Sequence, residues 1–191
     1  MQILLSTQPP DRQNHKCLVL GFFKDEKPPR GICGLVDWRL NSLISKEIKK
    51  GHIRGDFREQ VAIPRPERIN AEMLFLFGLG PLADLSYDRI YDAARQMMTA
   101  AGRMKLWEFA FDLPGNGRSA LSPAIVLEAM LTGFFDSLSE DIARLTHTKV
   151  CLVASPANLK EIADGLKRFN EHVKHMGSVD FSELEAHLAP L

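Results

Sequence analysis

The sequence lacks an excess of charge of either sign, with 24 Lys and Arg residues against 24 Asp and Glu residues in 191. Domains that bind nucleic acid or anionic lipid usually carry a clear basic excess. The basic stretch within residues 46–58 is interrupted by Glu47, Asp56 and Glu59, which is typical of a solvated helix face followed by a charged loop. We therefore do not expect nucleic acid or a membrane as a partner.

Cysteine is scarce, and the sequence contains only Cys17, Cys33 and Cys151. An odd number without a C-x-x-C pair excludes a disulfide framework and a zinc knuckle, and it favours a reducing compartment. A long hydrophobic run is also missing, since the longest, residues 73–83, is too short and too rich in glycine to cross a bilayer. The N-terminus has no signal-like apolar core, so we expect a cytoplasmic protein.

What is present is the composition of an ordinary globular domain, 45% hydrophobic and 25% charged. A chain of this length can bury a sizeable core without disulfides or metal. We predict one domain over residues 1–177, followed by a tail over residues 178–191 that forms a short amphipathic helix. Phe181, Leu184 and Leu188 give that tail an apolar stripe, which would dock on the domain or on another subunit.

Strand-like and helix-like patterns alternate along the chain. The predicted strands are residues 2–6, 17–23, 61–63, 73–79, 106–111 and 150–154, and the predicted helices are residues 36–51, 86–102, 122–135 and 158–177. Asp37, Ser86 and Ser122 are expected N-caps, and Asn158 with Glu161 suggests a capping box. The alternation predicts a three-layer α/β/α domain with helices on both faces of one sheet.

In such a fold ligands bind beyond the carboxyl ends of the strands, which directs attention to two glycine-containing loops. Gly115 and Gly117 permit close approach of the backbone, and Arg118 can pair with a phosphate or carboxylate. The competing interpretation is a simple turn before a helix that Ser122 caps. The full candidate set for an anion is Gly78, Gly80, Gly115, Asn116, Gly117, Arg118, Ser119 and Ser122.

The sequence gives weaker support to a dinucleotide site, a metal site or a reactive cysteine. The loop at residues 78–80 lacks the third glycine of a dinucleotide fingerprint and is followed by Pro81, so a tight turn explains it more simply. His172, His175 and His187 are better read as surface histidines than as a metal site. Cys17 and Cys151 lie in predicted strands and should be inert, whereas Cys33, near a helix start, could be more acidic. We predict no catalytic residues, no metal and no cofactor.

The order of several motifs resembles a known family. The motifs are residues 18–23 (LVLGFF), the helix end at residues 48–51 before Gly55, the strand at 74–77 with residues 78–80, and residues 124–133. Together they resemble the N-terminal domain of the leucyl (cytosol) aminopeptidase family over about residues 1–175. The resemblance implies a macro-domain-like fold with a mixed six-stranded sheet.

In that family peptidase chemistry belongs to a separate C-terminal domain that holds two metal ions, and this sequence ends at Leu191, where that domain would begin. The resemblance thus implies a non-catalytic, stand-alone relative that acts as an interaction or regulatory module. Its partner would be a copy of itself or an aminopeptidase-like protein. The alternative is a binder of a nucleotide-like small molecule bearing phosphate or carboxylate at residues 114–122.

The same resemblance bears on ADP-ribose. Macro domains that bind it typically carry an aspartate before the second strand and asparagines after it. At the matching positions this sequence has Lys16 and then Phe22 and Phe23. ADP-ribose binding is therefore not expected from these positions.

Overall fold

The computed structural model describes residues 1–12, 14–174 and 179–180. Six strands form one sheet in the order β1-β6-β5-β2-β4-β3, in which β3 runs antiparallel to β4 and the other pairs are parallel. The predicted six-stranded mixed sheet is thereby confirmed. The strands are β1 (Gln2–Ser6), β2 (His15–Phe22), β3 (Gln60–Pro64), β4 (Ala71–Gly78), β5 (Glu108–Phe111) and β6 (Lys149–Val153).

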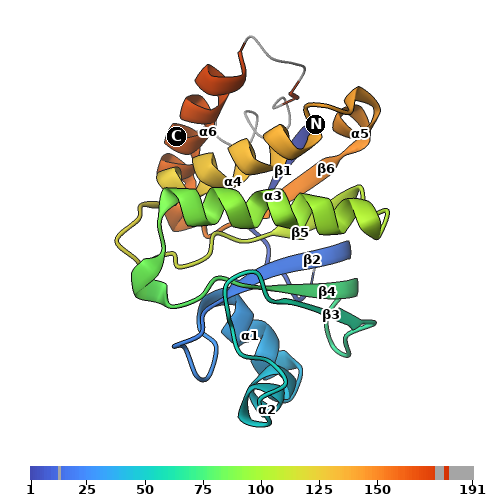
Figure 1. Ribbon diagram of the computed structural model, residues 1–191, viewed down its shortest axis with the longest axis vertical. Helices are drawn as coiled ribbons and strands as arrows, with labels where there is room; N and C mark the ends of the chain where they lie inside the picture. The colour runs from blue at the N-terminus through green and yellow to red at the C-terminus, as the bar shows by residue number, and fades with distance from the viewer. Residues whose placement is uncertain (13, 175–178, 181–191) are drawn as a thin grey trace.

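Helices pack against both faces of this sheet (Figure 1). The α-helices are α1 (Gly31–Arg39), α2 (Leu43–Lys49), α3 (Tyr87–Arg103), α4 (Pro123–Leu138), α5 (Ile142–His147) and α6 (Leu159–Val173), and the 3-10 helices are η1 (Leu82–Asp84) and η2 (Pro156–Asn158). Because side chains alternate along a strand, Cys17 and Val19 of β2 face α3, α4 and α6, whereas Leu18 and Leu20 face α1 and α2. The three-layer α/β/α arrangement is as predicted.

The prediction of one continuous helix over residues 36–51 is wrong. The structure has two helices, because Asn41 (φ 54°) and Ser42 (φ 60°) adopt the left-handed conformation and end α1. Asp37 is not an N-cap of α1 but lies buried inside it. Its carboxylate accepts hydrogen bonds from the Ser45 backbone N–H (3.1 Å) and hydroxyl (2.5 Å), and so joins the first turn of α2 to α1.

Other helix ends were predicted with mixed success. Ser86 and Ser122 cap α3 and α4 as expected, accepting from the N–H groups three residues further on. Asn158 makes no side-chain capping bond, because the 3-10 turn η2, capped by Ser155, precedes α6. The short helix α5 was missed, although Asp141 caps it through a 3.0 Å bond from the Arg144 N–H.

Much of the predicted tail, including its apolar stripe, lies outside the described residues. Within them, the Ile3 N–H donates to the Asp180 carbonyl (3.1 Å), so Asp180 lies beside β1. No helix in the described part of the chain is long and apolar enough to span a bilayer.

Candidate functional site

A cavity of about 150 Å³ lies at the carboxyl ends of β5 and β6, next to the start of α1. This is the sheet edge at which ligands bind in α/β folds. The polar side chains that line the cavity belong to Asp112, Asn116, Arg118, Ser155 and Asn158. The structure therefore places two of the predicted site residues, Asn116 and Arg118, in one cavity with three that were not predicted.

Arg118 is held by an ion pair with a carboxylate of the same chain. Its Nη1 lies 2.6 Å from Oε1 of Glu26, a side chain that is almost fully buried. The guanidinium also lies over the Phe23 ring, 5.7 Å from its centroid, and against Gly31, where a Cβ atom would come within 3.0 Å of Nη2. The anion-binding group predicted from the sequence thus already has an anion, from the loop that follows β2.

Asp112 follows β5 directly, lines the cavity and is buried. Burial raises the pKa of its carboxyl group to about 7, while a hydrogen bond from the Gly21 backbone and the charge of Arg118 lower it by less. A carboxyl group with this pKa changes between a hydrogen-bond donor and an anion near neutral pH. The cavity therefore offers a titrating acid beside neutral amides and a hydroxyl.

The remaining residues of the predicted loop support the turn. Gly115 (φ 75°) and Gly117 (φ 69°) have backbone conformations that favour glycine, and the Gly115 carbonyl accepts from the N–H groups of Arg118 and Ser119 at 2.9 Å each. The Ser119 hydroxyl is buried and has no hydrogen-bond partner in the part of the chain that the structure describes. Ser122 caps α4 and does not line the cavity. The turn and the Ser122 cap of the competing interpretation are present, while binding of an external anion at this loop stays a prediction.

The second glycine loop, residues 78–80, supports the end of β4 through backbone hydrogen bonds. Gly78 and Gly80 do not line the cavity but hydrogen-bond to the loop after α2, through Gly78 N–H to the Glu59 carbonyl (2.8 Å) and Gly80 N–H to the Gly55 carbonyl (2.9 Å). The Gly80 carbonyl accepts from the Lys24 N–H (2.9 Å). These contacts fix the end of β4, as the tight-turn interpretation suggested.

Glu26, Asp112, Ser155 and Asn158 were not predicted as site residues. Asp112 immediately follows a predicted strand and Ser155 a strand end, so a search for polar residues at strand ends would have found both. Glu26 carries no such signal, because it lies in a loop and reaches Arg118 across 92 positions of sequence.

The cysteines do not form a reactive site. Burial raises the pKa of Cys17 to about 12 and that of Cys151 to about 11, in agreement with inert thiols. The expectation of a more acidic Cys33 is wrong, because burial and the nearby Asp112 carboxylate raise its pKa. Among the described residues, which exclude His175 and His187, no three His, Cys, Asp or Glu side chains are grouped to hold a metal.

Comparison with solved structures shows a macrodomain fold. A mutant macrodomain of Oceanobacillus iheyensis superposes with a TM-score of 0.69 at 9% identity, covering 91% of this chain and 92% of that one. The Trypanosoma brucei macrodomain in complex with ADP-ribose gives a TM-score of 0.63 at 15% identity, and the match covers 90% of this chain and 68% of that one. A mutant tomato leucine aminopeptidase gives a TM-score of 0.57 at 14% identity, but the match covers 87% of this chain and only 35% of the tomato enzyme.

The family follows from the sequence. At these identities the structures establish the fold alone. A family model, the N-terminal domain of the cytosol aminopeptidase family, matches residues 19–141, more than half of the chain. The match runs from β2 through α4 and includes the loop that carries Arg118. The chain therefore belongs to the cytosol aminopeptidase family, through that family's N-terminal domain.

Proposed function

We propose that this domain is a non-catalytic binding module that recognises a small molecule through a phosphate or carboxylate group at the cavity beyond β5 and β6. The observation that carries the proposal is the buried ion pair between Arg118 and Glu26 at this cavity. A ligand anion would replace the Glu26 carboxylate on the guanidinium. Arginine favours such planar, two-point pairing with oxyanions.

The cavity size decides how much of a ligand it can enclose. Sites for whole drug-sized molecules measure roughly 300–1,000 Å³. At about 150 Å³ the present cavity encloses one anionic group with its hydrogen-bonding partners. Asn116, Ser155 and Asn158 would orient the atoms next to that group, and the rest of the ligand would extend out past the loop that carries Glu26.

The proposal also has support from the fold. The solved Trypanosoma brucei macrodomain complexes contain ADP-ribose and ADP, both of which carry phosphate. The cavity lies at the carboxyl edge of the sheet, where the helix α1 begins and where a parallel sheet gathers its loops. Recognition through one phosphate or carboxylate would not need the aspartate and asparagines that macro domains use for adenosine and ribose.

Thermal unfolding in the presence of phosphate, ADP, ADP-ribose and small dicarboxylates tests the proposal. A ligand at about 100 times its dissociation constant adds roughly 2.7 kcal/mol to the unfolding free energy. We expect a rise in melting temperature with at least one of these compounds, a larger rise in Glu26→Gln, and none in Arg118→Gln. The same preparations should hydrolyse leucine-anilide substrates at the background rate when manganese or zinc is added.

Each variant has its own stability cost, because either substitution leaves a buried charge without its partner. The comparison is therefore the ligand-induced shift within each variant. Arg30→Gln serves as the matched control, because Arg30 lies in the loop that carries Glu26 but is exposed and does not line the cavity. The absence of any shift in both the wild type and Glu26→Gln would refute ligand binding here, and metal-dependent peptidase turnover would refute the non-catalytic part.

A second candidate function is assembly with another copy of the chain. It is favoured by the Trp38 side chain on α1, which is 66% exposed, with Leu35 one turn earlier also exposed. A formal net charge of zero means that two copies have no net repulsion to overcome.

A further inference from the structure

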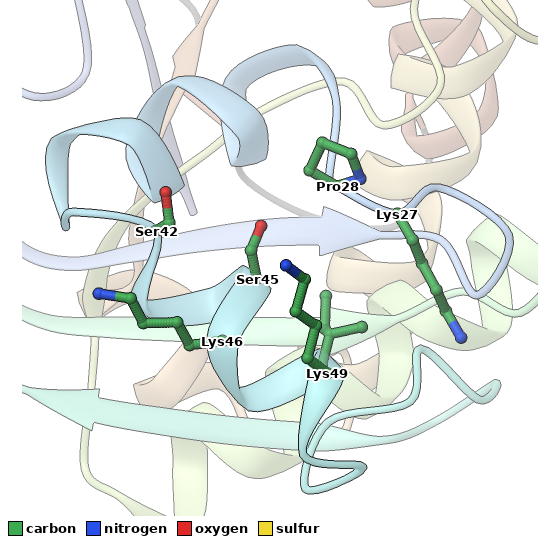
Figure 2. A pocket seen from close by; sticks show the side chains of 7 residues that line it. Lys27, Pro28, Ser42, Ser45, Lys46 and Lys49 are labelled. Atoms are coloured by element: carbon green, nitrogen blue, oxygen red, sulfur yellow. The ribbon is translucent and has the colours of Figure 1, made fainter.

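The structure has a second and larger cavity, of about 570 Å³, between α2 and the loop before α1 (Figure 2). Its volume lies in the usual range for small-molecule sites. Its lining combines three lysines and two serines with two apolar residues, namely Lys27, Lys46, Lys49, Ser42, Ser45, Pro28 and Ile48. Neither the family match nor the cavity at β5 and β6 accounts for this arrangement.

The three lysines have no ion-pair partner among the described residues. The acidic groups closest in the sequence have other partners. Glu47 binds Lys50 and His52 at 2.7 Å each, Glu26 binds Arg118, and Asp25 accepts from the Leu82 N–H at 2.9 Å. None of the described residues that line the cavity is acidic. Like charges gathered on one surface raise the local positive potential, so this cavity attracts anions although the chain as a whole is neutral.

Two further carboxylates lie near enough to be considered. The Asp56 carboxylate is bound to Lys24 at 2.7 Å, and this hydrogen bond is the main cause that lowers the pKa of Asp56, to which the charge of Lys27 contributes less. Asp37 is buried beneath α2 and accepts both bonds from Ser45. Neither carboxylate neutralises Lys46 or Lys49.

The charges are spread along the cavity. In Figure 2 Lys46 extends on the Ser42 side, Lys27 lies at the opposite end, and Lys49 lies between them. The Ser42 hydroxyl makes no capping bond and is available to donate, whereas the Ser45 hydroxyl already donates to Asp37. A ligand with several negative groups in a row matches this layout better than a single small anion does.

We infer that this lysine cavity binds a linear polyphosphate, either inorganic or as part of a nucleoside triphosphate. Lysine ammonium groups act as mobile point charges and suit successive phosphates. Pro28 and Ile48 would contact the non-phosphate part of a nucleotide. The inference does not depend on the proposed function, because none of these residues lines the cavity that contains Arg118.

Titration calorimetry on the full chain with inorganic tripolyphosphate, ATP and adenosine tests this site. We expect both phosphate compounds to bind and adenosine alone not to bind. The double variant K46Q/K49Q should weaken tripolyphosphate binding at least tenfold. Tighter binding of ATP than of tripolyphosphate would identify a nucleotide as the ligand, and equal binding would identify the phosphate chain alone.

The matched control is K160Q/K167Q, which removes two exposed lysines from α6 and changes the net charge equally. Its affinity for tripolyphosphate should remain that of the wild type. Equal weakening in both double variants, or no tripolyphosphate binding by the wild type, would overturn the inference. Arg118→Gln, tested in parallel, should leave tripolyphosphate binding intact; loss of binding in that variant would place the ligand at the other cavity and overturn the lysine site.

Discussion

Asp112 shows how a single buried side chain can make the candidate site sensitive to pH. It has little exposure, it follows the last residue of β5, and its pKa is raised to about 7 mainly by burial. Burial therefore destabilises the charged form of Asp112 in the folded chain, and the hydrogen bond from the Gly21 backbone and the charge of Arg118 partly offset this effect. Such cost at the edge where ligands bind is more typical of a functional position than of a purely structural one.

This raised pKa predicts a stability that falls as pH rises. Between about pH 4 and 7 the unfolded chain releases the Asp112 proton while the folded chain retains it, so folding stability decreases by up to about 1.4 kcal/mol per pH unit and is constant again above pH 7. Asp112→Asn should lack this decrease. Urea unfolding of both proteins at pH 5, 6, 7 and 8 measures it.

At each pH, the difference in unfolding free energy between the wild type and Asp112→Asn separates the contribution of Asp112 from that of the other titrating groups. His15, whose pKa is lowered by burial, contributes in the opposite direction in both proteins. Parallel pH profiles for the wild type and Asp112→Asn would contradict the raised pKa.

At the scale of elements, the connection between α1 and α2 shapes the larger cavity. The left-handed Asn41 and Ser42 turn the chain, and the Asp37 carboxylate then holds the first turn of α2 through Ser45. The start of α1 borders the smaller cavity, and α2 forms a wall of the larger one. This one carboxylate therefore fixes the wall that carries Lys46 and Lys49.

Replacing Asp37 with alanine should destabilise the domain by about 1.5–3 kcal/mol, the usual range for a hydrogen bond to a charged group. Ser45→Ala should cost less, because the backbone N–H of Ser45 still donates to Asp37. Chemical denaturation of the two variants and the wild type measures the order. An equal loss in both variants would show that the hydroxyl, and not the backbone bond, carries the connection.

At the scale of the whole molecule, α1 and α2 form one end of the domain, away from α5 (Figure 1). Trp38 on α1 is 66% exposed and Ile142 on α5 is 76% exposed. Burying a tryptophan against a second copy removes a large apolar area from water. The Arg39 guanidinium lies 5.0 Å from the centroid of the indole ring.

If the second candidate function is correct, light scattering should show a mass above that of the 21.4 kDa monomer that rises with protein concentration. Trp38→Ser should shift the equilibrium toward monomer, and the control Ile142→Ser should not. Removal of residues 178–191 separately tests the apolar stripe of the tail. A monomeric wild type at all concentrations would exclude this assembly.

The alternation of apolar runs determined most of this fold from sequence alone. Strands such as residues 17–23 and 73–79 are apolar throughout because both their faces are covered by helices, and that signal is local. The helix periodicity of α3 and the caps Ser86 and Ser122 are equally local. The break at Asn41 and Ser42 was missed because the apolar spacing of residues 36–48 continues across it, while the turn depends on Asp37 reaching Ser45 in space.

The candidate site was decided by tertiary structure. The sequence identified Arg118 as an anion partner from its loop, but its pairing with Glu26 and the burial of Asp112 arise between segments far apart in the chain. Lys46 and Lys49 are neighbours on α2, and only the tertiary structure brings Lys27 to the same cavity. Charge interactions and burial depend on distance in space and on exclusion of water, which local periodicity does not encode. The sequence therefore determined the layers and the family, and the packed chain decided which charges are already paired and which remain open to a ligand.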